Sequence, residues 1–294
     1  MITIKRLNEC TLQDAITAWN EGFSGYFTDV QMTIDVFLNR LTQEGLSANH
    51  SIVAFDGNKP IGIVLNGLRM IDGKKVAWNG GTGVATTYRG SGIGKKLIEE
   101  TLAIYEKEGV DIATLEAIKQ NEKAIRLYEK LGYVIEDKLF FFAHEGSFEI
   151  NPFQDYLDEY KYIKTVPLAV QYLSFYKSMS SWQTQVKSVR DGEAILAVDS
   201  QTGEKVGYAF LKRNFNDDGL HVSTALYQCE TASNRNDQQQ VAASLLSQLF
   251  SPFDQKLKRI TVNLSSNNQS VISLLQGAGF EKSVEQVYMK KICK

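Results

Sequence analysis

Cysteine and histidine are both scarce in this sequence, with three of each among 294 residues. The number of cysteines is odd and their spacing matches no zinc-binding pattern, so we expect neither a disulfide framework nor a zinc site. The histidines form no cluster, and we predict that the protein has no metal site. The six residues are Cys10, Cys229, Cys293, His50, His144 and His221.

Long apolar runs and an excess of charge of either sign are also missing. No stretch approaches the ~20 apolar residues that a membrane-spanning helix needs, and residues 1–14 contain no apolar core of signal-peptide length. The 32 Lys and Arg residues nearly balance 34 Asp and Glu residues, so the net charge of −2 provides no general attraction to nucleic acid. We therefore expect no membrane segment, no nucleic-acid partner and a cytoplasmic location.

The most informative glycines form a short cluster. It lies between an apolar, strand-like run that ends near Val84 and an amphipathic, helix-like run that starts at Lys95. Residues 89–94 read Arg-Gly-Ser-Gly-Ile-Gly. The first N–H groups of a helix are unpaired and lie at the positive end of its dipole, and glycine leaves them uncovered. This arrangement binds phosphate groups. The segment predicts a ligand that carries a diphosphate.

The commoner phosphate-binding loops do not fit this segment. A Walker A loop requires a glycine five positions before its Gly-Lys pair and Ser or Thr after it. Here Arg89 stands at the first position and Lys96 follows Gly94-Lys95. The dinucleotide fingerprint spaces its last glycine one place further along. These differences argue against ATP, GTP and NAD, and against a nucleotide-dependent kinase.

The segment instead resembles motif A of the GNAT superfamily of acetyl-CoA-dependent N-acetyltransferases, Gln/Arg-x-x-Gly-x-Gly/Ala. Arg89, Gly92 and Gly94 occupy its fixed places. Residues 121–133 resemble motif B of the same superfamily, Asn-x-x-Ala-x-x-Leu-Tyr-x-x-x-Gly-Phe, with a tyrosine in place of the final Phe. The resemblance covers about residues 2–142. The expected order there is one strand, two helices, a three-strand meander, and then helix, strand, helix and strand.

The second half of the chain resembles a diverged copy of the first. Residues 268–280 repeat the motif B pattern 147 positions later, with Asn268 in the place of Asn121 (268 − 121 = 147). The corresponding stretch for motif A has no glycine and contains Asp237, so we expect no cofactor site there. The predicted fold class is α/β, of the α+β type with a mixed sheet, and it consists of two tandem GNAT folds. The expected division is a catalytic domain at 1–148, a polar linker at 149–165 and a degenerate domain at 166–294.

The resemblance implies acetyl-CoA as the cofactor, without a metal. Main-chain N–H groups of motif A would hold the diphosphate, and the bulged end of the preceding strand would pair with the pantetheine arm. An ordinary glycine turn, or for Arg89 a solvated surface position, is the alternative. The implied cofactor-binding residues are Gly83, Val84, Arg89, Gly90, Ser91, Gly92, Ile93, Gly94, Lys95, Asn121 and Tyr128.

Three residues are implied to act in catalysis. Tyr128 is the candidate general acid, because a phenol with a pKa near 10 keeps its proton at neutral pH; the alternative is a packing tyrosine that only contacts sulfur. The N–H group of Val84 is the candidate oxyanion donor. Glu116 has the spacing of the general base in ribosomal-protein alanine acetyltransferases, and a solvent-facing strand glutamate is the alternative.

The acceptor is expected to bind between the first two helices, although a flexible loop with core anchors fits the same residues. These candidates are Glu21, Phe23, Tyr26 and Phe27. The implied function is acetyl transfer from acetyl-CoA to a primary amine of a small molecule or peptide by direct attack. A non-catalytic acyl-CoA-binding regulator and a transferase of longer acyl groups stay open, as does a homodimer through the second domain.

Overall fold

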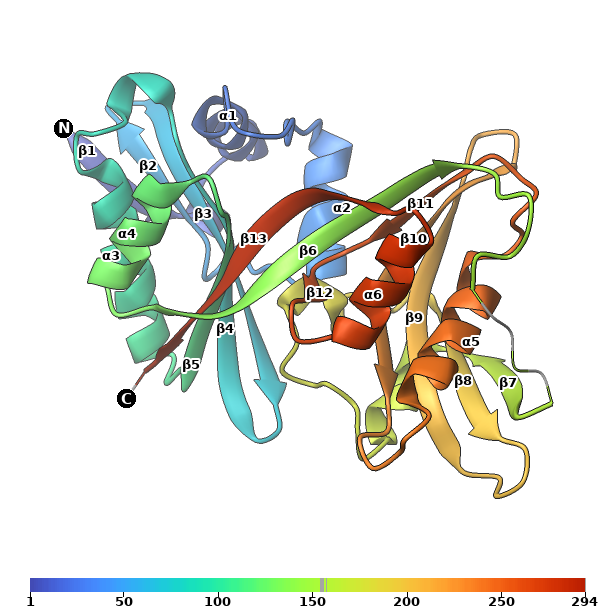
Figure 1. Cartoon of the computed structure of the whole chain (residues 1–294). Coiled ribbons are helices and arrows are strands. Elements are labelled where there is room, and N and C mark those ends of the chain that lie inside the picture. Colours follow the sequence, from blue (N-terminus) through green and yellow to red (C-terminus); the bar gives the residue numbers. More distant parts are fainter. Residues whose placement is uncertain (154–155, 157, 294) are drawn as a thin grey trace. The chain divides into compact units, whose positions relative to one another are not determined.

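The structure is a computed structural model that describes residues 1–153, 156 and 158–293 (Figure 1). It divides into two compact units. Unit 1 comprises Met1–Glu136 and Val287–Lys294, and unit 2 comprises Asp137–Gln286. Within the predicted linker, Gln154, Asp155 and Leu157 lie outside the described residues, as does Lys294 at the end of the predicted second domain.

Unit 1 is built on a mixed sheet in the order β1-β2-β3-β4-β5-β13. Its strands are β1 (Ile2–Arg6), β2 (Ile52–Asp56), β3 (Lys59–Ile71), β4 (Lys74–Val84), β5 (Ile112–Ile118) and the end of β13 (Glu281–Ile292). Its helices are α1 (Leu12–Gly22), α2 (Ile34–Glu44), α3 (Ile93–Lys107) and α4 (Glu122–Lys130), with short 3₁₀ turns η1 (Leu7–Glu9) and η2 (Thr86–Tyr88).

Local sequence signals explain where the first helices begin and end. Thr11 and Asp14 form a reciprocal capping box at the start of α1. Thr33 caps α2 through its hydroxyl, which accepts a hydrogen bond from Val36 N–H, and Gly45 ends the helix with a left-handed φ of 65°.

Helices cover both faces of the unit 1 sheet. Ala77 of β4 lies in a buried core with Leu97 of α3 and Tyr128 of α4. On the other face Trp19 of α1 packs against Gly81, where an added Cβ would lie 2.7 Å from the indole ring. Ala77 and Gly81 are four residues apart and would share a face of a regular strand. The extra residue Gly80, which lies between them in the pairing with β3, shifts the alternation, so α3 and α4 lie on one face and α1 lies on the other.

Unit 2 has a sheet in the order β6-β11-β10-β9-β8-β7. Its strands are β6 (Val134–Gly146, from Asp137 onward), β7 (Tyr160–Thr165), β8 (Glu193–Asp199), β9 (Lys205–Phe215), β10 (His221–Thr231), β11 (Leu257–Thr261) and the short β12 (Leu264–Ser265), which pairs with β6. Its helices are α5 (Gln238–Phe250) and α6 (Gln269–Gly277), with 3₁₀ turns η3 (Pro167–Tyr172) and η4 (Trp182–Thr184).

The predicted linker at 149–165 is wrong over its last six residues. These residues form β7, which pairs antiparallel with β8 from Tyr160↔Asp199 to Thr165↔Ala194. Tyr160 is buried, whereas the following Lys161 is exposed. β7 ends the sheet order, and lysine is common on such edge strands because its charge opposes further pairing. The polar composition that indicated a linker belongs to an edge strand.

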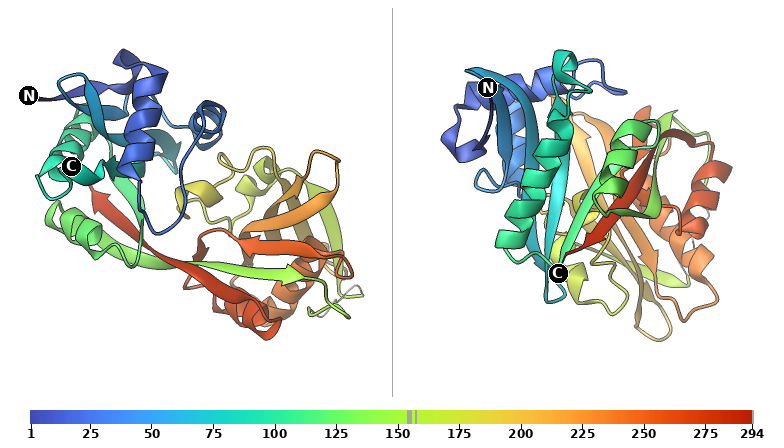
Figure 2. Two further views of the ribbon diagram at one scale, coloured as in Figure 1. Left: turned by 90° about the horizontal axis from the view of Figure 1, so that it is seen from above. Right: turned by 90° about the vertical axis from the view of Figure 1, so that its left-hand side faces the viewer.

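The compact units also differ from the predicted division of the chain. The last strand of the first half, β6, belongs to unit 2 from Asp137 onward, and the last strand of the chain, β13, belongs to unit 1 from Val287 onward. Val287 and Met289 are buried in the core of unit 1, and Cys293 N–H donates to Asp111 O at 2.9 Å. The C-terminal end of β13 lies near α3 (Figure 2). Each unit thus receives a strand from the other half of the sequence.

Candidate active site

The site in unit 1 begins where β4 separates from β5. The parallel pairing of these strands runs from Val76↔Ile112 to Asn79↔Leu115. A register shift between β3 and β4 follows at once, because Asn79 pairs with Asn66 but Gly81 pairs with Leu65, which leaves Gly80 as the bulged residue. Beyond the bulge, β4 continues beside β3 while its β5 side is open. The bulge expected from the glycines is present.

The main chain at the end of β4 presents a donor to this open edge. Ala85 N–H donates to Ile61 O on β3 at 2.8 Å. Successive N–H groups of a strand point to opposite sides, so the N–H of Val84 points away from β3. The carbonyl of Val84 is bound from that side by Arg89 Nε at 2.9 Å. Val84 therefore places an N–H at the edge where an incoming chain would pair with β4.

The glycine loop before α3 is uncovered, as a phosphate site requires. Gly90 and Gly92 have left-handed φ values of 82° and 88°, and a Cβ added to either would meet nothing within 4 Å. Gly92 caps α3 without any side-chain hydrogen bond. The first helical bond there runs from Lys96 N–H to Gly92 O at 3.1 Å. The N–H groups of residues 93–95 precede that bond and have no partner within the helix.

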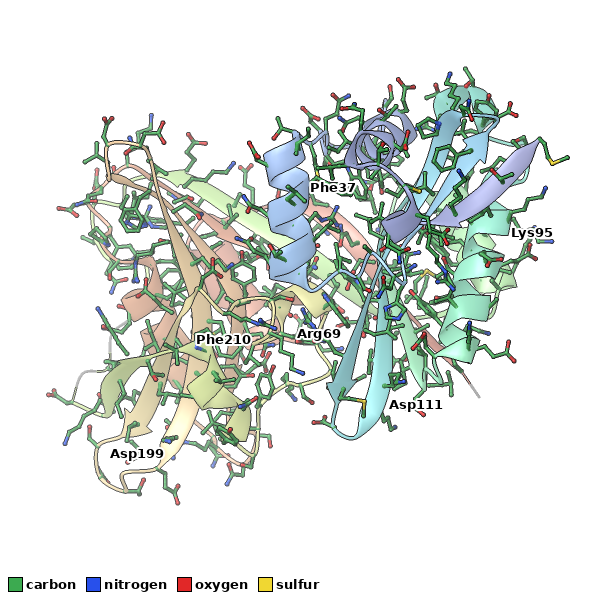
Figure 3. All side chains as sticks on the ribbon, turned by 180° about the vertical axis from the view of Figure 1, so that it is seen from behind. Phe37, Arg69, Lys95, Asp111, Asp199 and Phe210 are labelled. Atoms are coloured by element: carbon green, nitrogen blue, oxygen red, sulfur yellow. The ribbon has the colours of Figure 1, made fainter. Side chains whose placement is uncertain are left out.

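Two polar side chains of this loop have other contacts. The Ser91 hydroxyl donates to Tyr88 O at 2.6 Å. Lys95 pairs with Glu99 at 3.4 Å on the outer surface of α3 (Figure 3). Because these two side chains already have partners, the loop offers mainly main-chain N–H donors, and these donors fit a diphosphate.

Tyr128 of α4 lies beside the open end of β4. It is 7% exposed, and its hydroxyl shares a side-chain hydrogen bond with Thr82 of β4. Burial raises the pKa of Tyr128 to about 12, although the bond to Thr82 acts in the opposite direction. Thr82 Oγ1 in turn accepts from Asn79 Nδ2 at 2.8 Å. The phenol is therefore protonated throughout the neutral pH range and held in a polar chain.

Asn121 and Tyr26 join Tyr128 at this end of the sheet. Asn121 caps α4 by accepting from Ala124 N–H at 3.3 Å. Its side chain also shares a hydrogen bond with the hydroxyl of Tyr26, whose pKa is raised by burial and lowered by that bond. Tyr26 lies close enough to Tyr128 to raise the pKa of that phenol through charge repulsion. Three predicted site residues are thus brought together.

Glu116 lies on the opposite face of the sheet. Leu115 and Ala117 on either side of it are buried in the core with α3 and α4, so alternation directs Glu116 toward the face of α1. Trp78 Nε1 donates to Glu116 Oε2 at 2.6 Å. The carboxylate lies one residue past the last β4–β5 pair, at the point where the strands separate.

The loop between α1 and α2, residues 23–33, carries a ladder of aromatic rings. The ring centroids of Trp19 and Phe23 are 4.2 Å apart, those of Phe23 and Tyr26 are 5.3 Å apart, and those of Tyr26 and Phe27 are 5.2 Å apart. Phe27 is 53% exposed and Glu21 is exposed. Of the predicted acceptor residues, Phe23 and Tyr26 point toward the site, and Phe27 and Glu21 lie at the surface.

Sequence reasoning did not include several residues that hold this site. Trp78 and Thr82 bond to predicted site residues, Trp19 bonds to the α1–α2 loop, and Asn79 bonds to Thr82. Thr82 is the one hydroxyl within the glycine-rich end of β4, and that position was a usable signal. Trp78 had no such signal, because its bond to Glu116 depends on the pairing of β4 with β5. The omitted residues are Trp19, Trp78, Asn79 and Thr82.

Comparison with known proteins identifies this half of the chain. A family model for the acetyltransferase (GNAT) family matches residues 13–133. This part of the chain belongs to the GNAT family. It is 34% identical over 94 residues to N-alpha-acetyltransferase 30 of Saccharomyces cerevisiae (strain ATCC 204508 / S288c), a match that covers 31% of this chain and 52% of that relative. The chain thus spans about half the length of the curated relative.

Solved structures extend the GNAT fold to the whole chain. A tandem GNAT protein from the clavulanic acid biosynthesis pathway has a TM-score of 0.65 at 14% identity, over 99% of this chain and 98% of that chain. A GCN5-related N-acetyltransferase from Sphaerobacter thermophilus has a TM-score of 0.64 at 12% identity, over 99% and 95%. The predicted tandem GNAT folds are confirmed.

The GNAT fold of unit 2 keeps the bulge of unit 1 but not its open phosphate loop. Its bulge is at Tyr227, 147 positions after Gly80 (227 − 80). Asp237 caps α5, where unit 1 has bare glycines, and its carboxylate binds Arg235 at 2.6 Å and the Tyr160 hydroxyl at 2.6 Å. These bonds hold the pKa of Asp237 at about 2. The α5 start therefore carries an ion-paired carboxylate where the α3 start has uncovered glycines.

The edge of β10 in unit 2 is also filled by side chains. Glu230 lies 147 positions after Gly83 (230 − 83) and accepts from Asn268 Nδ2 at 3.2 Å, and the same nitrogen donates to Cys229 O at 2.7 Å. Burial raises the pKa of Glu230 to about 7, although Lys177 and the bond from Asn268 act in the opposite direction. We infer that unit 2 does not bind the cofactor.

Replacing Glu230 by Gln is expected to change how stability depends on pH. The folded pKa of about 7 lies above the ordinary 4.5, so its contribution to stability is complete below pH 4.5 and is lost as pH rises through 7. Gln cannot ionise, and the variant should be more stable than the parent at pH 8 by on the order of 2 kcal/mol. Denaturant unfolding at pH 5 and pH 8 measures this. The exposed Glu204→Gln serves as control, and equal pH dependence in parent and Glu230→Gln would contradict the assignment.

Across residues 1–153, 156 and 158–293, no three His, Cys, Asp or Glu side chains are grouped so that they could hold a metal ion. In that same part of the chain, no helix has both the length and the apolar character needed to cross a bilayer.

Proposed function

We propose that unit 1 binds acetyl-CoA and transfers its acetyl group to a primary amine by direct attack. The observation that carries this proposal is the conjunction of an uncovered glycine loop, an open β4 edge and a buried, protonated Tyr128 within one unit. The match of residues 13–133 to the GNAT family supports it.

The proposed cofactor contacts use main-chain groups for the most part. The N–H groups of residues 90 and 92–95 would hold the diphosphate, because Gly90 and Gly92 are uncovered and the first N–H groups of α3 lie at its positive end. The β4 edge at residues 82–84 would pair with the amide-bearing pantetheine arm in the manner of an added strand. Asn121 lies at the same edge through its bond to Tyr26.

Each proposed catalytic group has a separate task. Acetyl-CoA supplies an activated thioester carbonyl. Val84 N–H would donate to the carbonyl oxygen as negative charge develops on it. The Tyr128 hydroxyl would give its proton to the departing sulfur, since burial keeps that proton in place. Glu116, on the opposite face, would accept a proton from the amine, directly or through water.

For the acceptor, we propose the α-amine at the N-terminus of a peptide or protein. The support is the relative named N-alpha-acetyltransferase 30, together with the aromatic α1–α2 loop beside the site. A small-molecule amine is the second candidate class.

The test uses the purified full chain with acetyl-CoA and two panels, one of peptides with free α-amines and one of small amines. Release of free thiol and mass spectrometry of the products report transfer. Peptides acetylated at the α-amine, but not peptides blocked there, are the expected result. Turnover of small amines alone would change the acceptor class, and CoA binding without turnover of either panel would indicate a regulator. Propionyl-CoA and butyryl-CoA in the same assay report acyl-chain length.

A further inference from the structure

Arg89 makes contacts that do not belong to a phosphate ligand. Its Nε donates to Val84 O at 2.9 Å, and its Nη2 donates to Gly22 O at 3.0 Å and to Ser24 O at 2.9 Å. All three acceptors are main-chain carbonyls. They belong to three segments, namely the end of β4, the last residue of α1 and the start of the α1–α2 loop.

The same three segments are in direct contact through glycines. A Cβ added to Gly22 would lie 2.9 Å from the carbonyl carbon of Gly83 and 3.2 Å from the nitrogen of Val84. A Cβ added to Gly83 would lie 2.9 Å from the ring of Phe23. The end of α1 is thus seated directly against the end of β4.

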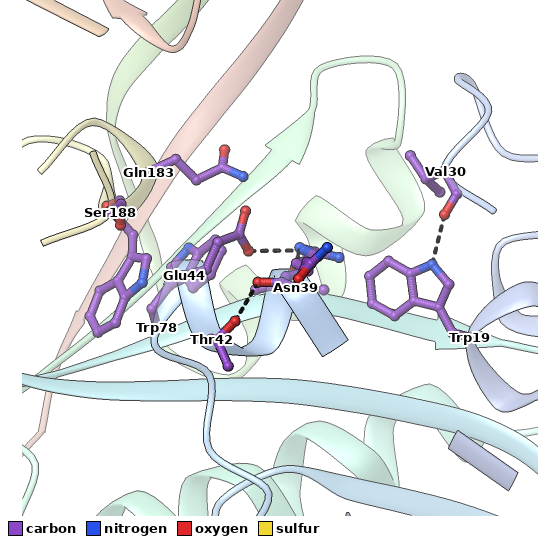
Figure 4. Close-up of polar contacts among 12 residues, drawn as sticks. Trp19, Val30, Asn39, Thr42, Glu44, Trp78, Gln183 and Ser188 are labelled. Carbon is purple, nitrogen blue, oxygen red and sulfur yellow. Dashed lines mark hydrogen bonds and ion pairs between the residues drawn. The ribbon is translucent and has the colours of Figure 1, made fainter. Parts of the chain in front are cut away.

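Two further contacts hold the α1–α2 loop beyond Ser24. The Tyr26 hydroxyl is bonded to Asn121 at the start of α4. At the far end of the loop, Trp19 Nε1 donates to Val30 O at 2.7 Å (Figure 4). Arg89 differs from these other residues in its position, because it directly precedes Gly90 of the glycine loop.

We propose that Arg89 is a positioning residue that couples the glycine loop to the α1–α2 loop, and that it does not bind the diphosphate. This rests on the proposed function. A ligand held by the N–H groups of Gly90 and Gly92 fixes the main chain next to Arg89. The guanidinium then fixes the carbonyls of Gly22 and Ser24, and with them the loop where the acceptor is expected. Because coupling between sites is reciprocal, an acceptor bound at the loop should also strengthen cofactor binding.

The experiment compares the parent with Arg89→Gln, Arg89→Lys and a charge control, Lys107→Gln. Lys107 is an exposed cation at the far end of α3, so its loss removes one charge without touching these carbonyls. CoA affinity is measured by calorimetry, and hydrogen exchange by mass spectrometry is followed in residues 23–33 with and without CoA.

In the parent and the control, CoA should slow exchange in residues 23–33 by about tenfold, within the usual range of coupling between sites. Arg89→Gln should bind CoA within about threefold of the parent, since main-chain groups hold the phosphates, but its loop should exchange faster without CoA and should gain no protection from CoA. Arg89→Lys retains one donor group and should recover part of the effect. With a peptide acceptor, the KM for the peptide should rise while the KM for acetyl-CoA stays nearly constant.

Two results would overturn the coupling. One is a loss of CoA affinity of about 100-fold in Arg89→Gln with unchanged loop exchange, which is the behaviour of a charged phosphate contact. The other is normal CoA binding by the parent with no change in exchange at residues 23–33. If the parent binds no CoA at all, the proposed function fails first, and that failure is visible in the calorimetry alone.

Discussion

Gly92→Asp should abolish CoA binding while the protein stays folded. Gly92 has a left-handed φ of 88° and open space around it, and aspartate tolerates that conformation better than most residues. Aspartate is also a favourable helix cap, so α3 should not be weakened. Its carboxylate, however, would compete with the diphosphate for the same N–H groups. We expect CoA affinity to fall at least ~100-fold, in line with losing several charge-assisted hydrogen bonds.

The control for this prediction is Gly92→Asn, which has nearly the same shape but no charge. It should keep a substantial part of the affinity if charge is the cause. Calorimetry measures binding and thermal unfolding measures the fold. Unaltered CoA affinity in Gly92→Asp would remove the glycine loop as the diphosphate site.

Tyr128→Phe should lower kcat by about 10²- to 10⁴-fold, the usual contribution of a positioned general acid. The ring would stay buried, and Thr82 would keep its bond from Asn79, so folding and CoA affinity should change little. The pKa of about 12 implies that the parent phenol does not lose its proton near neutral pH. The defect should therefore be similar at every pH between 6 and 9.

A neighbouring phenol provides the matched control. Tyr133 is buried, and its ring centroid lies 5.9 Å from that of Tyr128. Tyr133→Phe removes the same atom from the same core and should leave kcat within a few-fold of the parent. Steady-state kinetics with a peptide acceptor would separate the two variants. Equal turnover in Tyr128→Phe and the parent would exclude Tyr128 as the acid.

Several features of the site were predictable because they depend on short stretches of chain. Glycines at alternate positions before an amphipathic run place Gly90 and Gly92 in a bare loop at a helix start. The spacing of Asn121 and Tyr128 within one helix puts the helix cap and the phenol on the same element, since helical geometry relates residues seven apart. The roles of these residues stay predictions until the variants are measured.

Other features depend on contacts that no local pattern contains. Arg89 matches a motif position, yet its guanidinium reaches carbonyls 65 and 67 positions away in the sequence. The bond from Trp78 to Glu116 requires the register of two parallel strands. The bond from Asn268 at the start of α6 to Glu230 of β10 joins residues 38 positions apart in the sequence.

The sequence alone determined which half of this chain has an uncovered glycine loop, where most helices and strands lie, and that the second half repeats the first. These properties follow from backbone freedom and hydrophobic period, which act over a few residues. The tertiary structure decided that β6 belongs largely to unit 2 and the end of β13 to unit 1. A strand's pattern shows that one face is buried but not which neighbour its N–H and C=O groups will pair with, and that choice belongs to the folded sheet.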